Sequence, residues 1–120
     1  MISLKDIRKK ILSGDFSSFL HWGSNDNIHP SEVAQLLNEL PLDAAINAFN
    51  SFPQKKQVIV FSYLELSLQK KIIRNTNKDN ASFILNKLSS DDRLTLINSF
   101  KTGVERSHIL ELLEDKNKKQ

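Results

Sequence analysis

A repeat of 24 residues runs through most of the sequence, and it is marked by three identical leucines, Leu40, Leu64 and Leu88. The same spacing aligns further apolar columns, which hold Leu36, Val60 and Ile84; Leu37, Phe61 and Leu85; and Phe49, Ile73 and Ile97. A period of about 20–50 residues is typical of folds in which each unit buries its apolar face against the next unit. The chain is therefore predicted to fold as a stack of similar units.

Each repeat contains two positions that can begin a helix. One position holds His29, Pro53 and Asn77, and the other holds Pro41, Glu65 and Ser89. Asn and Ser are preferred N-cap residues, and proline is tolerated at a helix start because its missing N–H has no intrahelical partner there. Each repeat is thus predicted to be two helices of roughly three turns.

These marks predict an all-α superhelical stack, or solenoid, of about nine short helices. The helices are expected over residues 3–13, 15–22, 30–40, 42–51, 54–64, 66–75, 78–88, 90–100 and 103–115. Ser3 and Asp6 have capping-box spacing at the first helix start, and Gly14 is placed to end that helix in a left-handed conformation. The spacing of the helices does not set the hand of the stack.

One segment, "VIVFSYL", is rich in β-branched and aromatic residues and could form a strand. Gln57, Phe61 and Leu64 nevertheless keep the helical columns of the flanking repeats. A helix is therefore predicted here. Trp22 follows an apolar run and precedes Gly23, so we expect it to fill the core at a helix end.

The charged residues are segregated along the chain, although the net charge is only +3. Residues 11–53 contain no Lys or Arg and five acidic residues, whereas residues 54–78 contain six basic residues and only Glu65 as an acid. Adjacent lysines on a helix splay apart by about 100° and do not form a continuous stripe. Solvated helix faces are therefore expected, and no nucleic-acid partner.

The sequence lacks the residues or motifs that several classes of function require. The absence of cysteine excludes disulfides, thiolate catalysis and cysteine-ligated zinc. His21, His29 and His108 are not spaced as zinc ligands, and no phosphate-binding glycine motif or nucleophile motif is present. No segment approaches the ~18 apolar residues of a membrane span, since Glu65 stops the longest run. We expect neither an enzyme nor direct membrane insertion by these residues.

The length of 120 residues suits one cored domain. A single helical domain is predicted over residues 1–115, followed by a disordered polar tail over residues 116–120.

Three segments, "ILSGDFSSFL", "IHPSEVAQLLNELP" and "FILNKLSSDDRLTLINSF", occur in that order. Together they resemble the cytosolic N-terminal domain of the MgtE family of magnesium transporters and channels. The resemblance covers nearly all of residues 4–115. It implies a right-handed superhelix, followed in the family by paired CBS domains and a transmembrane pore, so that this chain would be a fragment. It also implies a cytoplasmic domain of a bacterial inner-membrane protein that is a homodimer at full length.

The resemblance further implies a regulatory function. In such transporters Mg²⁺ sits between acidic residues of this domain and of the CBS domains and holds the assembly closed. Asp91 falls on an acidic position of the family that contributes to this interdomain site, and Asp92 stands beside it. The family's other acidic ligand positions fall on Ile59 and Thr95. The predicted metal ligands are therefore Asp91 and Asp92, with Mg²⁺ bound weakly or not at all by the fragment alone.

Asp91 and Asp92 also have a structural interpretation. Ser89 and Asp92 have capping-box spacing, and carboxylates in the first turn interact favourably with the helix dipole.

Two other functions stay open at this point. The flagellar motor switch family also has a "HP" helix start followed by short helices, although "ILSGDFSSFL" before "IHP" favours the transporter. The second open alternative is a generic α-solenoid that binds a partner protein on its acidic face.

Overall fold

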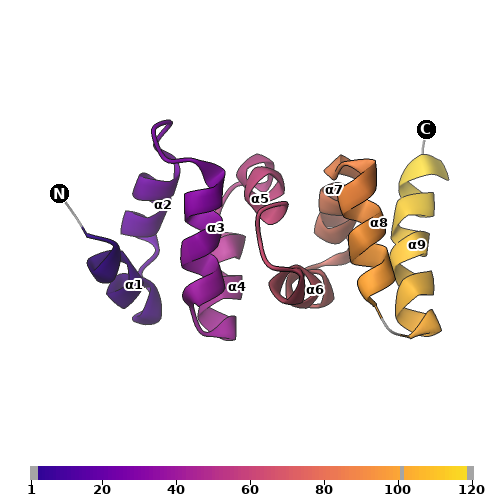
Figure 1. The fold of residues 1–120 in the computed structure, drawn as a ribbon, viewed down its shortest axis with the longest axis horizontal. Helices are drawn as coiled ribbons and strands as arrows, with labels where there is room; N and C mark the ends of the chain where they lie inside the picture. Colours follow the sequence, from indigo (N-terminus) through magenta and orange to yellow (C-terminus); the bar gives the residue numbers. More distant parts are fainter. Residues whose placement is uncertain (1–2, 101, 119–120) are drawn as a thin grey trace. The chain divides into compact units, whose positions relative to one another are not determined.

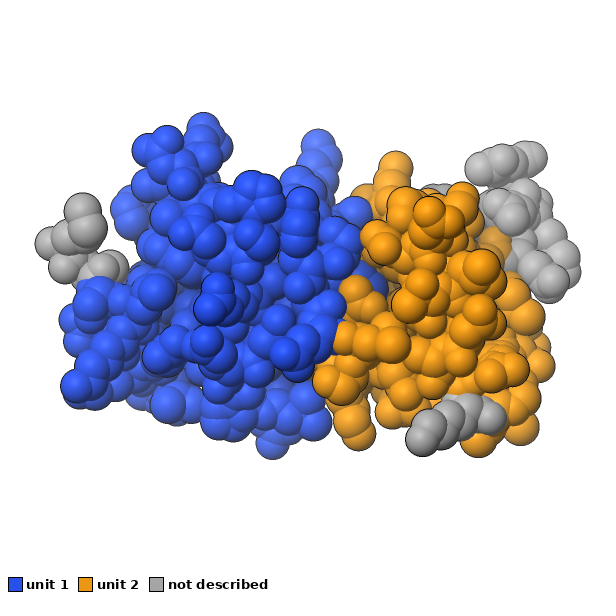
Figure 2. All heavy atoms as spheres, viewed as in Figure 1, with its two compact units in different colours: residues 1–65 blue, residues 66–120 orange. Residues whose placement is uncertain are grey.

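The computed structural model describes residues 3–100 and 102–118, with the side chains of residues 114–118 left aside. All nine predicted helices are present in this part of the chain, and no strand occurs in it (Figure 1). The chain divides into two compact units, residues 1–65 and residues 66–120 (Figure 2). The all-α prediction, including a helix over "VIVFSYL", is confirmed.

The first unit contains five helices within the described residues. They are α1 (Leu4–Leu12), α2 (Ser17–Gly23), α3 (Pro30–Glu39), α4 (Leu42–Ser51) and α5 (Gln54–Phe61). Helix α1 packs against α2 and α4, and α3 packs against α4 and α5. Contacts thus run between helices that are close in sequence, as a helical stack requires.

The second unit contains four helices within the described residues. They are α6 (Leu66–Asn75), α7 (Lys78–Lys87), α8 (Ser90–Ser99) and α9 (Gly103–Lys118). Helix α6 packs against α8, and α9 packs against both α7 and α8. Figure 1 shows α8 and α9 side by side and running in opposite directions.

Two helix ends differ from the predicted ones by three residues, and the other helix bounds differ by at most two. Helix α5 ends at Phe61 instead of Leu64, because the N–H groups of Tyr63 and Leu64 donate to the carbonyls three residues earlier and tighten the end into a turn. Helix α9 continues through Lys118, and residues 119–120 of the predicted tail lie outside the described residues. The single domain, the disordered tail and the right-handed superhelix stay predictions.

The repeat columns form the core. Leu40, Leu64 and Leu88 are 9%, 5% and 6% exposed, and the columns of Leu36 and of Leu37 are buried in every repeat. The third column loosens at its end, since Ile97 is only half-buried. Helices of about ten residues are unstable alone in water, so this burial against neighbouring helices is what stabilises them.

Four of the junctions between consecutive helices share one geometry. A single extended residue, Leu40, Phe52, Leu88 or Phe100, follows the helix end, with ψ between 124° and 156°. Leu40 and Phe52 precede prolines, which disfavour the helical conformation for the residue before them. All four side chains are buried. One residue therefore both ends a helix and fixes the turn to the core.

Side chains cap the helix starts that the sequence marked. The Oγ of Ser3 accepts from the N–H of Asp6 at 3.2 Å, and Asn77 caps α7 through the N–H of Asn80. At α3 the capping residue is His29, whose Nδ1 accepts from the N–H of Ser31 while Glu32 accepts from the N–H of His29. Gly14 has a φ of 91°, as predicted for the residue that ends α1.

An aromatic cluster holds the first unit together. The rings of Phe19 and Phe52 lie 4.8 Å apart and are buried, whereas Trp22 is only half-buried. The expectation that Trp22 fills the core is therefore wrong, and Phe19 is the aromatic residue that α2 buries. Gly23 lets the Phe52 ring approach α2, since a Cβ at this position would lie 2.7 Å from Phe52 Cζ.

Substitution Gly23→Ala is expected to destabilise the chain by about 1–2 kcal/mol, because the added methyl group collides with the buried Phe52 ring, which packs against Phe19. The measurement is urea unfolding followed by circular dichroism. Gly103→Ala is the matched control, since a Cβ there would meet nothing within 4 Å. Equal midpoints for the two variants would show that Phe52 can move away from Gly23.

Candidate functional site

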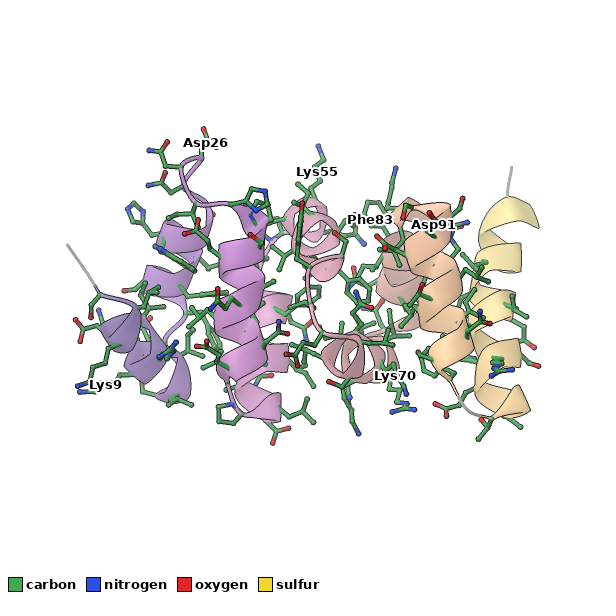
Figure 3. All side chains as sticks on the ribbon, viewed as in Figure 1. Lys9, Asp26, Lys55, Lys70, Phe83 and Asp91 are labelled. Carbon is green, nitrogen blue, oxygen red and sulfur yellow. The ribbon has the colours of Figure 1, made fainter. Side chains whose placement is uncertain are left out.

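Asp91 and Asp92 lie in the first turn of α8, and both are exposed. Figure 3 shows Asp91 on this helix. The Oγ of Ser89 accepts from the N–H of Asp92 at 3.2 Å, which fixes the start of the helix. The structure therefore places both predicted residues at a capped helix start, where their carboxylates point away from the core.

Asp92 departs from the apolar pattern of the repeat. One repeat earlier, the corresponding residue of α6 is Leu68, which is only 7% exposed. On α8 a carboxylate therefore stands where α6 presents a packed leucine. This exchange suits a surface that meets water, ions or a polar partner.

No ion pair neutralises Asp91 or Asp92 among the residues that the structure describes. The adjacent Arg93 points its guanidinium at the end of α7, where it donates to the carbonyl oxygens of Leu85, Asn86 and Leu88. Two neighbouring negative charges thus remain available to a cation from outside.

The two carboxylates fit Mg²⁺ by their chemistry, since this ion prefers oxygen ligands. They do not complete a site alone. Within residues 3–100 and 102–118, no group of three or more His, Cys, Asp or Glu side chains is placed to hold a metal ion. This surface can therefore contribute two carboxylates to a site that water or another domain would complete.

Ile59 and Thr95, the other positions implied by the resemblance, bring no acidic ligand to the surface. Thr95 lies on α8 one turn after Asp91 and is exposed. Ile59 is on α5 and is 50% exposed.

Other acidic residues are engaged in local interactions. Arg74 donates to Glu105 at 2.8 Å, and this hydrogen bond lowers the pKa of the Glu105 carboxyl. Hydrogen bonds from Ser17 lower the pKa of Asp15 at the start of α2. Arg8 pairs with Glu39. These groups stabilise helix ends and helix pairs, and they are less free to bind a cation than the α8 pair.

The sequence analysis missed a recurrent device at the helix junctions. At three helix starts, the side chain of the residue four positions after the helix-start residue donates to a carbonyl at the end of the preceding helix. Gln57 donates to Phe52 at 2.9 Å, Arg93 to Leu88 at 3.1 Å and Arg106 to Phe100 at 2.7 Å. These bonds satisfy carbonyls that have no partner inside their helix, and the two arginines also complement the helix dipole. The sequence did contain a signal for these bonds, because each of the three side chains lies four residues after a helix-start residue.

Comparison with known protein families gives one match. Residues 28–120 match the family described as the MgtE intracellular N domain. The chain belongs to the MgtE N domain family. No curated protein matches the chain.

Membership of the MgtE N domain family decides between the two families that the sequence left open, in favour of the transporter. The matched residues include α3 to α9 and hence both Asp91 and Asp92. In the part of this MgtE N domain that the structure describes, none of the helices combines the length and apolar character needed to cross a bilayer.

Substitution Arg93→Met is expected to destabilise the domain by about 1–2 kcal/mol, because it keeps the length of the side chain but removes three hydrogen bonds to the end of α7. Thermal unfolding measures the loss. Lys71→Met is the control, since Lys71 is exposed on α6. If both variants have the same melting temperature, the hydrogen bonds of Arg93 do not stabilise the folded chain more than its hydration in the unfolded chain does.

Proposed function

We propose that this MgtE N domain is a cytosolic regulatory domain that senses Mg²⁺ and gates a magnesium transporter by packing against the CBS domains of the same protein. The observation that carries the proposal is the exposed pair Asp91 and Asp92, which no basic side chain neutralises among the described residues of a chain of this family.

The chemistry of Mg²⁺ suits a site shared between domains. The ion keeps several of its waters and is usually bound through one or two protein carboxylates. Asp91 and Asp92 would supply these carboxylates from α8, and the facing domain would supply its own acidic groups. No dedicated cage in one domain is required.

The same charges explain how such a site would switch. Without the cation, like charges on two facing surfaces repel each other and favour separation of the domains. A cation that binds only between the surfaces favours the packed state, and the population shifts by its differential affinity for the two states. The domain would therefore respond to cytosolic Mg²⁺ without any chemical reaction.

The carboxylates also contribute to the helix itself. Acidic side chains in a first turn stabilise a helix by about 0.3–1 kcal/mol each at exposed positions. This role does not compete with metal binding, because the Ser89 cap engages the N–H of Asp92 and not its carboxylate.

The proposed partners are the CBS domains and the pore domain of the same protein, which would act as a homodimer on the cytoplasmic side of a bacterial inner membrane. Because such an interdomain site loses the ligands of its other half in this chain, the chain alone should bind Mg²⁺ weakly.

A titration of the amide NMR spectrum with MgCl₂ at constant ionic strength tests the proposal. The expected result is a saturable shift confined to residues 89–95, with a dissociation constant of about 1 mM or weaker. Asp91→Asn should abolish this shift. Asp43→Asn is the matched control, since Asp43 is also exposed in the first turn of a helix, and it should leave the shift unchanged.

Two outcomes would count against the proposed function. One is a linear shift spread over all acidic residues, which indicates charge screening. The other is a saturable site that persists in Asp91→Asn, which would place the cation elsewhere.

A further inference from the structure

The start of α3 is capped by the imidazole ring of His29, a type of side chain that changes its charge near neutral pH. The Nδ1 of this ring lies 3.0 Å from the backbone nitrogen of Ser31 and 2.8 Å from the Ser31 Oγ. A backbone N–H donates and does not accept, so Nδ1 must be the acceptor and carries no proton. The cap therefore requires the neutral imidazole, with its proton on Nε2.

The same ring also joins two segments of the first unit. The centre of the His29 ring lies 5.3 Å from the centre of the Tyr63 ring, and the two ring planes meet at 79°. Tyr63 belongs to the turn that follows α5, and α5 packs against α3. Edge-to-face pairs of this kind are favourable. The position of the cap thus also sets a side-chain contact between the start of α3 and the end of α5.

Two titratable groups contact His29. The Glu32 carboxylate, on α3 itself, accepts from the backbone N–H of His29 at 2.8 Å, and Tyr63 provides the ring contact. Among the described residues, no ion pair includes His29. The other charged residues of the segments around it are Asp26 before α3, Glu39 at its end, Asp43 on α4, and Lys55, Lys56 and Glu65 on and after α5.

Protonation of the ring is incompatible with this arrangement. A proton on Nδ1 removes the lone pair that accepts from Ser31 and directs a second N–H at the first. The dipole at the start of α3 disfavours the positive charge, whereas the Glu32 carboxylate attracts it. The ring must therefore turn away from the N–H of Ser31, and this movement also changes its contact with Tyr63.

We infer that His29 is a pH-sensitive cap, through which acidification breaks the capping hydrogen bond of α3 and loosens the contact between α3 and the turn after α5. The cap stabilises α3 while the imidazole is neutral, and this stabilisation is lost as the pH falls. The caps of α1, α7 and α8 are Ser3, Asn77 and Ser89, whose side chains do not titrate in this range. The response is therefore local to α3 and its contact with Tyr63, and it needs no bound Mg²⁺.

Two NMR measurements on the whole chain test this inference. The nitrogen chemical shifts of the His29 ring report which nitrogen carries the proton, and the expected result at about pH 7.5 is a proton on Nε2 and none on Nδ1. Hydrogen exchange, corrected for the intrinsic exchange rate, reports opening of the first two turns of α3. The equilibrium constant for this opening should rise about fivefold between about pH 7.5 and about pH 5.5, as expected for the loss of an N-cap.

Variants separate this cap from other effects of pH. His29→Asn supplies an amide that caps a helix and does not titrate, so the opening of α3 should be the same at both pH values. His21→Asn is the matched control, since His21 is exposed on α2 of the same unit, and it should leave the response of α3 unchanged. A proton on Nδ1 at about pH 7.5 would overturn the inference. An equal rise in the opening of α3 in wild type and His29→Asn, or no rise in wild type, would also overturn it.

Discussion

The structure depends on four junctions between its helices, at each of which one buried residue in extended conformation both ends a helix and anchors the turn. Leu40, Phe52, Leu88 and Phe100 play this part, and each is at most 9% exposed. Helices of about ten residues do not persist alone. Burial at these four junctions, together with the side-chain caps from Gln57, Arg93 and Arg106, therefore stabilises helices that would not form alone.

The candidate metal ligands inherit their position from one of these junctions. Leu88 fixes the turn, Ser89 caps the helix that follows, and Asp91 and Asp92 are thereby held in the first turn of α8. Arg93 strengthens the same junction by bonding to the end of α7, which keeps its charge away from the carboxylates. One local arrangement thus serves stability and leaves an acidic surface available to a cation.

Local signals made much of the fold predictable. Residues such as Ser89 and Asn77 favour helix starts by their own chemistry, and the apolar columns report which helix faces are buried. The end of α5 was missed because the turn after Phe61 depends on bonds formed in the folded chain. The caps of Gln57 and Arg93 were also missed, since they require knowing which carbonyls lie nearby. Asp91 and Asp92 were singled out by a family resemblance, because the apolar columns of the repeat do not include their positions.

The most direct test of the dependence on junctions is native-state hydrogen exchange in Leu88→Ala. The substitution shortens a side chain that is 6% exposed, and the expected result is a joint loss of amide protection in α7 and α8. The control Leu94→Ala, at a residue of α8 that is 58% exposed, should leave protection unchanged. Loss confined to the residues next to position 88, with the remainder of both helices still protected, would contradict the view that the buried junction holds the two helices together.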